Sequence, residues 1–168
     1  MKRILFIALF AICALPLFGQ KMTKEEKAAA AQARYEAALE SINAKTFVII
    51  PSEYLTADGE AVSNIDNNVF LSSEGEQAFG QGACVTDNTY DNVAEISSYE
   101  VSVDKKGNVK LLMTVSGRMW RGTYKISMRK GDNVADVIFN PANGTTRRFT
   151  GPVVPVVGSD YNKRTHPI

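Results

Sequence analysis

The chain has 168 residues, enough for one domain with a hydrophobic core but too few for two ordinary domains. It contains 19 Lys and Arg residues against 18 Asp and Glu residues, and a net charge of +1 argues against a general nucleic-acid-binding protein. One histidine and two cysteines exclude a multi-histidine metal site and a disulfide framework.

The first twenty residues have the pattern of a secretory signal peptide. Lys2 and Arg3 precede an apolar run over residues 4–18, which is shorter than the roughly 18–20 residues that span a membrane. We therefore expect residues 1–20 to be removed on export, and the protein to be periplasmic or secreted with no membrane span after cleavage. The alternatives are an uncleaved anchor and a lipid on Cys13, although Ile12 is not the small residue that a lipidation motif requires.

Cleavage changes both the charge and the cysteine count. Without Lys2 and Arg3 the net charge becomes −1, and Cys84 is the one cysteine left, so the core must stabilise the fold without an internal disulfide. We expect Cys84 to be a small apolar strand residue. The nearby carboxylates of Asp87 and Asp91 would not lower the pKa of its thiol, as a reactive cysteine needs.

Residues 21–44 contain one predicted helix. Thr23-Lys24-Glu25-Glu26 matches a capping box, and the residues that follow are rich in Ala, Glu, Gln and Arg, which favour helix. Tyr35, Leu39 and Ile42 form one narrow apolar stripe. The sequence therefore predicts a helix from Lys24 to Ile42 that lies on the domain rather than forming its core.

Residues 45–157 have the two-residue hydrophobic period of β-strands. Strands are expected at residues 47–50, 69–71, 77–85, 93–103, 109–116, 120–128, 134–139 and 145–150. Tight turns such as Asp104-Lys105-Lys106-Gly107 and Asn143-Gly144 join consecutive strands. The fold class is therefore mainly β, an antiparallel meander that forms a curved sheet or a small barrel. Strand tilt and shear decide between sheet and barrel, and the sequence does not reveal them.

Three local features complete this picture. Gly122 lies within a predicted strand and is a candidate β-bulge. Pro152-Val153-Val154-Pro155 fits an edge strand or an extended strap, because proline cannot donate a ladder hydrogen bond. Residues 158–168 are expected to form a mobile C-terminal tail.

No group of residues matches a catalytic or metal site, and no cofactor is implied. His166 lies two residues from the C-terminus, where a side chain is rarely held as firmly as a catalytic group must be. The glutamates show no spacing that selects an acid–base pair. The Asp-Asn pairs are expected to form turns, and one set is dense enough to be a calcium candidate: Asp87, Asn88, Asp91 and Asn92.

Four residues are candidates for ligand binding: Arg118, Trp120, Tyr124 and Arg147. Basic and aromatic residues that share a sheet can bind acidic glycans or nucleic acid, although the near-neutral charge disfavours nucleic acid. If Phe149 points inward, strand alternation places Arg147 on the same side. An inward arginine needs a partner, which we expect to be an internal salt bridge, with a ligand anion as the alternative.

The segment from about Thr46 to Pro155 resembles the family called domain of unknown function 4251. The matching motifs are Lys45-Thr46-Phe47-Val48, Gln77-Ala78-Phe79-Gly80, Asp104-Lys105-Lys106-Gly107-Asn108-Val109, Lys130-Gly131-Asp132-Asn133-Val134-Ala135, and Arg148-Phe149-Thr150-Gly151 with Val153-Val154-Pro155. The chain departs from the family at Gln81-Gly82-Ala83-Cys84, where many relatives carry a longer aromatic run. The resemblance implies a small secreted protein of a Gram-negative bacterium, and it brings no activity, cofactor or catalytic residues.

These observations predict an exported, non-catalytic envelope protein that binds a small or amphipathic ligand, or a protein partner, on its curved sheet. The alternative is a structural or scaffold protein that acts through its N-terminal helix or an edge strand. An enzyme acting on carbohydrate or peptide is the least favoured reading, since it needs two carboxylates that face each other in a cleft. The deciding feature is whether side chains fill the inner face of the sheet or leave a pocket of about 300 Å³ or more.

Overall fold

The computed structural model describes residues 22–63, 66–86 and 90–164. The expected signal peptide, Cys13, Asp87, Asn88 and His166 lie outside these residues. The elements are one helix, α1 (Lys24–Asn43), and ten strands: β1 (Thr46–Ile49), β2 (Glu53–Leu55), β3 (Ala61–Ser63), β4 (Phe70–Glu74), β5 (Gln77–Gln81), β6 (Asn92–Val103), β7 (Val109–Ser116), β8 (Arg121–Met128), β9 (Val134–Pro141) and β10 (Arg147–Pro155).

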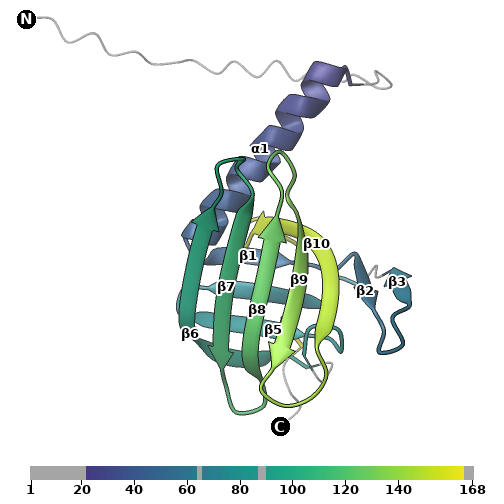
Figure 1. Cartoon of the computed structure of the whole chain (residues 1–168), viewed down its shortest axis with the longest axis vertical. Helices are drawn as coiled ribbons and strands as arrows, with labels where there is room; N and C mark the ends of the chain where they lie inside the picture. The colour runs from purple at the N-terminus through teal and green to yellow at the C-terminus, as the bar shows by residue number, and fades with distance from the viewer. Residues whose placement is uncertain (1–21, 64–65, 87–89, 165–168) are drawn as a thin grey trace, which may run out of the picture.

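Eight of the strands form a closed antiparallel barrel (Figure 1). The strand order is β1-β4-β5-β6-β7-β8-β9-β10, and β10 pairs back onto β1, with Phe47 opposite Pro155 and Ile49 opposite Val153. The mainly β prediction is confirmed, and closure selects the barrel over the open sheet. The expectation that residues 152–155 form an edge strand or a strap is wrong, because this segment pairs with β1 to close the barrel.

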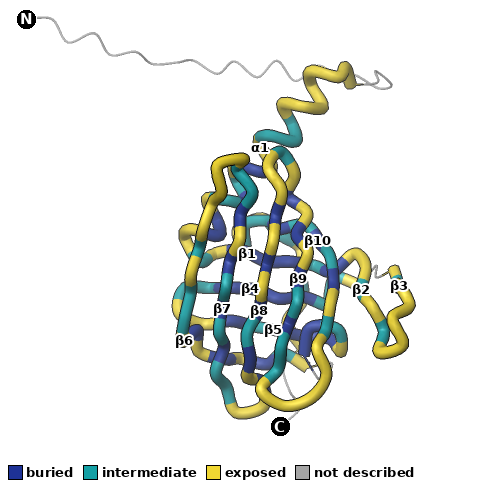
Figure 2. Tube along the Cα trace, in the orientation of Figure 1, coloured by how far each residue is buried: buried dark blue, intermediate teal, exposed yellow. Residues whose placement is uncertain are grey.

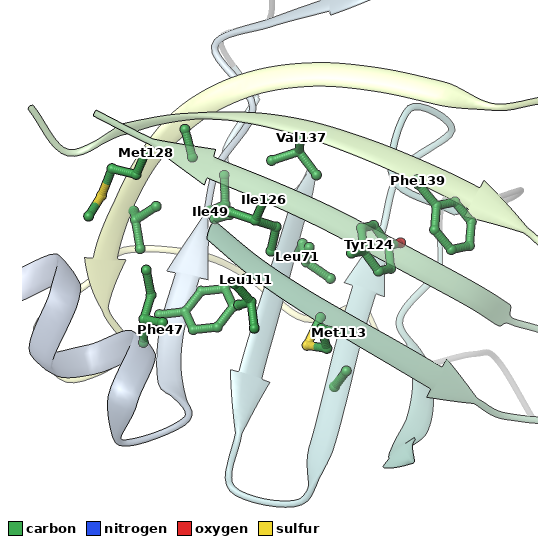
Figure 3. Close-up of a cluster of buried hydrophobic side chains, with 14 of the residues drawn as sticks. Phe47, Ile49, Leu71, Leu111, Met113, Tyr124, Ile126, Met128, Val137 and Phe139 are labelled. Carbon is green, nitrogen blue, oxygen red and sulfur yellow. The ribbon is translucent and has the colours of Figure 1, made fainter. Parts of the chain in front are cut away.

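Side chains fill the interior of the barrel (Figure 3). Along β7 to β10, buried inward-facing residues alternate with more exposed outward-facing ones, whereas β1 and β4 are buried at almost every position (Figure 2). The largest fully buried side chains of this core include Phe47, Ile49, Leu71, Leu111, Met113, Tyr124, Ile126, Met128 and Phe139. The interior is therefore a packed hydrophobic core, and the binding surfaces of the molecule have to be sought on its outside and at its ends.

Helix α1 lies across the end of the barrel at which the β6–β7 and β8–β9 hairpins turn (Figure 1). Its capping box is formed, and the buried residues Tyr35, Ala38 and Ile42 join the core. The Tyr35 hydroxyl donates to the Gly107 carbonyl (2.6 Å), and the Tyr99 hydroxyl donates to the Ile42 carbonyl (2.5 Å). The first half of the helix projects beyond the barrel and is largely exposed (Figure 2). No helix in the described part of the chain has the length and hydropathy needed to cross a membrane.

The β-bulge lies in a different strand from the expected one. The pairing of β8 with β7 and β9 is continuous through Gly122, whereas the register shifts between Ile96 and Ser98 in β6. Gly122 is needed for a different reason. A Cβ atom there would lie 2.4 Å from the carbonyl oxygen of Asn140, so a side chain would push β8 and β9 apart.

The hairpin formed by β2 and β3 extends the sheet beyond β10 and stands away from the barrel (Figure 1). The strand predictions do not include it, because each strand has only three residues and too little periodicity to stand out. The one sequence signal for it is Asp58-Gly59, a dipeptide typical of hairpin turns.

The C-terminal segment is attached to the barrel as far as Arg164, so the expectation of a loose tail is wrong for residues 159–164. Tyr161 packs edge-on against Phe70, and its hydroxyl donates to Glu74 (2.8 Å). The Lys163 ammonium lies 2.8 Å from Glu74 and 3.4 Å from the centroid of the Phe79 ring. Alternate tail side chains thus contact the outer face of β4 and β5.

The backbone of this tail is held by one buried amide. The Gln81 side chain is 1% exposed; it accepts a hydrogen bond from the backbone N–H of Arg164 (2.7 Å) and donates one to the Asn162 carbonyl (3.1 Å). In turn, the backbone N–H of Asp91 donates to the Arg164 carbonyl (3.0 Å). The tail therefore covers apolar surface of the barrel wall that would otherwise face water.

Candidate functional site

A groove of about 490 Å³ lies on the outer face of β6, β7, β8 and β9. Its floor is formed by the half-buried side chains of Leu112 and Ile138, which face outward on either side of Lys125 in one cross-strand row. A volume in this range suits a small organic ligand, for which typical sites measure about 300–1,000 Å³.

Charged side chains surround the apolar floor of this groove. Lys110 and Lys125 lie near its centre, with Glu100 on β6 and Asp136 on β9 at its two sides. Within the described ranges, none of these four side chains takes part in an ion pair. They are consequently available to a ligand with a charged group.

A second cavity, of about 280 Å³, continues the groove toward the β2–β3 hairpin. The two cavities share Asp136 and Ile138, and the second one adds Leu55 and Arg148. Register places Arg148 next to Ile138 on the outer face, and Leu55 is 40% exposed. Apolar and cationic side chains therefore alternate along one row across the sheet. We call this combined surface the outer groove.

Two of the four residues chosen from the sequence are buried. Trp120 is 3% exposed and Tyr124 is fully buried. The Trp120 indole N–H donates to the Tyr124 hydroxyl (3.0 Å), which donates to the Val85 carbonyl (2.8 Å). Burial raises the pKa of Tyr124 well above its ordinary value, because the phenolate would be desolvated. These two side chains close the barrel end opposite α1.

Arg147 points inward beside Phe149, as strand alternation predicts. Its guanidinium carbon lies 5.8 Å from the centroid of the Phe139 ring, and that ring stacks on Tyr124 with centroids 4.2 Å apart. Burial lowers the pKa of the Arg147 guanidinium below its ordinary value, and the nearby Cys84 opposes this shift. The internal salt bridge expected for Arg147 stays a prediction.

Arg118 and Trp120 both line a cavity of about 290 Å³ at the same end of the barrel. The β7–β8 turn and the β9–β10 loop form its two sides, and Arg121, Phe139 and Pro141 also line it. We call this cavity the end pocket. Arg121 and Phe139 are not among the four candidates chosen from the sequence. Arg121 directly follows the conspicuous Trp120, whereas nothing in the pattern distinguishes Phe139 from other core residues.

The remaining candidates from the sequence have structural roles or lie outside the described residues. Cys84 lies in a turn between β5 and β6 rather than in a strand, and burial raises the pKa of its thiol to about 11. The Asn92 amide donates to the Gly80 carbonyl and to the Thr86 hydroxyl (3.2 Å each), which fixes this turn. Within the described residues, no three His, Cys, Asp or Glu side chains gather closely enough to hold a metal ion.

Comparison with known proteins identifies a solved structure with the same fold. A crystal structure described as a DUF4251 family protein from Bacteroides eggerthii matches this chain with a TM-score of 0.67 and 22% sequence identity, over 79% of this chain and 94% of that one. The chain has the DUF4251 fold. This result agrees with the resemblance found in the sequence motifs. No protein-family model matches the chain, and no curated protein matches it either.

The similarity to a DUF4251 protein does not indicate an activity, since the name denotes a domain of unknown function. The match indicates no enzyme family, and at this identity it establishes the fold alone. The function has to be argued from the surfaces of this chain, among which the outer groove and the end pocket have volumes that suit small molecules.

Proposed function

We propose that the protein is an exported, non-catalytic envelope protein that binds a small amphipathic molecule in the outer groove. The observation that carries this proposal is the position of the groove of about 490 Å³. It lies on the outside of the curved sheet, because core side chains fill the inside. The ligand that fits best is a single-chain amphiphile with an anionic head.

The apolar part of such a ligand would lie along the floor of the outer groove. Leu112, Ile138 and Leu55 follow one another across the sheet, and the aliphatic stems of Lys125 and Arg148 lie between them. Burying a chain methylene against such a surface contributes about 0.8 kcal/mol, so a chain of several carbons is needed for useful affinity.

The anionic head would bind the cations of the same row. Lys125 and Arg148 flank Ile138 directly, whereas the carboxylates of Glu100 and Asp136 lie at the sides of the groove. A negatively charged head next to Ile138 would therefore have one cation on each neighbouring strand, with the carboxylate of Asp136 two residues away on β9. Charge-assisted hydrogen bonds of this kind are among the stronger polar contacts.

The proposed location rests on the first twenty residues. The basic pair Lys2 and Arg3, the apolar run over 4–18 and the break at Gly19 are the pattern of a secretory signal peptide. Fractionation of the native cells, with mass spectrometry of the mature N-terminus, tests this part. Recovery of a cytoplasmic chain that still begins at Met1 would contradict it.

Dodecanoate, below its micelle concentration, is the probe for ligand binding. We expect saturable binding in calorimetry and a loss of at least about tenfold in affinity for Ile138→Asn, because a polar amide would interrupt the apolar floor. Val93→Asn is the matched control, since Val93 is also an exposed strand residue but lies outside the outer groove.

Three results would count against the groove. They are absence of saturable dodecanoate binding to the folded wild-type protein, equal losses for Ile138→Asn and Val93→Asn, and tighter binding of dodecylamine than of dodecanoate. Native mass spectrometry of protein purified from its own cells adds an independent check, in which a bound amphiphile is expected.

A scaffold role through α1 is the second candidate, favoured by the exposure of the first half of the helix. Deleting all of α1 would remove Tyr35, Ala38 and Ile42 from the core, so the suitable variant lacks residues 24–33 alone. If the helix recruits a partner, this variant loses that partner in a pull-down while dodecanoate binding persists. Unchanged partners would exclude the scaffold role.

A further inference from the structure

The β9–β10 loop contains an Asn-Gly pair, Asn143-Gly144, and the sequence has no other. The loop lies at the barrel end opposite α1, and both residues of the pair are exposed (Figure 1). Gly144 has a φ of 103°, and a Cβ atom placed on it would meet only a side-chain atom of Pro141, at 4.0 Å. Water therefore reaches the peptide bond between Asn143 and Gly144.

The polar groups at the tip of this loop are not held by hydrogen bonds. Within the described residues, neither the backbone N–H of Gly144 nor the side-chain amide of Asn143 takes part in a hydrogen bond. The loop is fixed at its base instead, where the Ala142 N–H donates to the Arg121 carbonyl (3.0 Å). The tip can therefore change its backbone conformation without loss of a hydrogen bond.

An asparagine side chain can react with the backbone that follows it. The nitrogen of the next residue can attack the side-chain carbonyl carbon, because the two atoms are held close together in the same chain and close a five-membered ring. Glycine hinders this attack least, since it has no Cβ atom next to its nitrogen and its φ and ψ angles are the least restricted. An exposed Asn-Gly pair without hydrogen bonds thus combines the conditions that the reaction needs.

From these features we propose that Asn143 is a self-modification site, at which water converts the asparagine to aspartate and isoaspartate without an enzyme. The nitrogen of Gly144 gives its proton to a solvent base and forms a bond to Cγ of Asn143. The bond from Cγ to the side-chain nitrogen breaks, and ammonia leaves after taking up a proton from solvent. Water then opens the succinimide ring at either of its carbonyl carbons, so one water is consumed and one ammonia is released.

The new carboxylate would lie beside two cations. Asn143 lines the end pocket together with Arg118 and Arg121, and no acidic side chain is among the described lining residues. Neither arginine forms an ion pair with a carboxylate in the described part of the chain. Conversion of Asn143 therefore supplies the end pocket with a negative charge that its two exposed arginines attract.

One tryptic peptide, residues 131–147, contains Asn143 and two asparagines that serve as internal controls. Asn133 is 7% exposed, and its side-chain amide donates to a backbone carbonyl of β10 (3.1 Å). Asn140 precedes a proline, whose nitrogen has no proton to lose. The structure therefore predicts that one asparagine of the three reacts.

The experiment incubates the full chain in neutral buffer and follows this peptide by tandem mass spectrometry, with a fresh sample digested in parallel. We expect a gain of about 1 Da at Asn143, with both aspartate and isoaspartate as products. Conversion at Asn143 should be at least about tenfold faster than at Asn133. Asn143→Gln is the matched variant and should show no gain at position 143, since the longer side chain would have to close a six-membered ring.

The substitution Asn143→Asp tests the effect of the product on the end pocket. We expect it to shift the side-chain Nε–H signals of Arg118 and Arg121 in a ¹H–¹⁵N correlation spectrum, because the new carboxylate lies next to them. Asn43→Asp is the matched control: it adds the same charge at an exposed residue of α1 and should leave these signals in place.

Three outcomes would overturn the proposal. They are an unchanged mass at Asn143 while a free peptide of residues 131–147 is converted, equal rates at Asn143 and Asn133 in the folded chain, and unmoved arginine signals in Asn143→Asp. Circular dichroism at the end of the incubation verifies that the protein is still folded. Dodecanoate binding does not involve this loop, so failure of this proposal leaves the proposed function untouched.

Discussion

At the residue scale, one hydroxyl group holds the barrel end at which the end pocket lies. The Tyr124 hydroxyl accepts a hydrogen bond from the Trp120 indole and donates one to the Val85 carbonyl, and all three groups are buried. The sequence shows Trp120 and Tyr124 as aromatic residues on one strand face. It does not show that their polar atoms satisfy each other, because the third member comes from the β5–β6 turn, 39 residues away.

The substitution Tyr124→Phe tests this arrangement. It leaves the Val85 carbonyl and the Trp120 N–H without their partner, and a buried unsatisfied group costs about 1–3 kcal/mol. We expect a loss of this size in the free energy of unfolding, measured with urea and far-UV circular dichroism. Tyr54→Phe is the control and should change stability by less than about 0.5 kcal/mol. Equal stability of Tyr124→Phe and wild type would refute the role of the hydroxyl.

For Arg147, the sequence predicts the direction of the side chain but not its neighbours. Strand alternation correctly places it on the inner side with Phe149, because the two-residue period is a local property. The neighbour of its guanidinium is the Phe139 ring on the adjacent strand, which pairing register determines. Strand pairing also decides that Arg121 lines the end pocket, because the β9–β10 loop opposite it belongs to a different hairpin.

At the scale of elements, α1 consists of two halves with different roles. The second half contributes Tyr35, Ala38 and Ile42 to the core, whereas the first half contacts little of the barrel. The capping box at Thr23 and Glu26 therefore stabilises a part of the helix that tertiary packing does not support.

We expect Thr23→Ala to fray the first turns of α1 without weakening the barrel. The helical signal in circular dichroism should decrease, because an N-cap contributes about 0.5–2 kcal/mol to its own helix. The free energy of global unfolding should change by less than about 0.5 kcal/mol, since the frayed residues are outside the core. A global loss above about 1 kcal/mol would mean that the whole helix unfolds with the barrel.

The C-terminal tail depends on the charge of Glu74. Burial alone would raise the pKa of this carboxyl, but hydrogen bonds from Lys163, Ser72 and Tyr161 outweigh it, so the pKa lies below its usual value of 4.5. A carboxyl with a lowered pKa in the folded state stabilises that state above pH 4.5. Its contribution is lost as the pH falls through the lower, folded-state pKa.

The prediction compares the full chain with a chain that ends at Gly158. The full chain should be more stable in urea at pH 7, and this difference should shrink as the pH falls below 4.5 and through the lower, folded-state pKa of Glu74. Glu74→Gln in the full chain should lower the difference at pH 7. If the difference persists in acid after Glu74 is protonated, the aromatic contacts and the Gln81 amide hold the tail without the ion pair.

Local sequence signals predict the helix, strands and turns of this chain better than they predict which strands lie at the edge of the sheet. The capping box, the two-residue period and the Asp-Lys-Lys-Gly turn each depend on neighbouring residues, and the structure confirms the helix start, the strands and the hairpin that they predict. The edge-strand prediction for residues 152–155 is wrong because it rests on Pro152 and Pro155, and proline is typical of edge strands. β10 accommodates both of them, each opposite a residue of a neighbouring strand, and pairing over a separation of about 100 residues leaves no local mark.

At the scale of the whole molecule, the barrel closes by pairing its first strand with its last. β1 lies between β4 and β10, so residues 153–155 complete the wall of the barrel, and Val153 is buried in the core. The backbone N–H of Val153 donates to the Asn133 carbonyl (2.7 Å), and the Asn133 amide donates to the Val153 carbonyl (3.1 Å). Closure of the barrel therefore depends on both β1 and β10.

This closure gives a sharp boundary for C-terminal truncation. A chain that ends at Gly158 keeps all of β10, so it should retain its strand content and a single cooperative thermal transition. A chain that ends at Pro152 loses the pairing of residues 153–155 with β1 and removes Val153 from the core, and it leaves the edge of β1 unpaired. We expect this shorter chain to melt without cooperativity or to aggregate, as measured by circular dichroism and light scattering. A cooperative transition close to that of the longer chain would show that the remaining strands form a stable open sheet, and that closure is not what makes the barrel one unit.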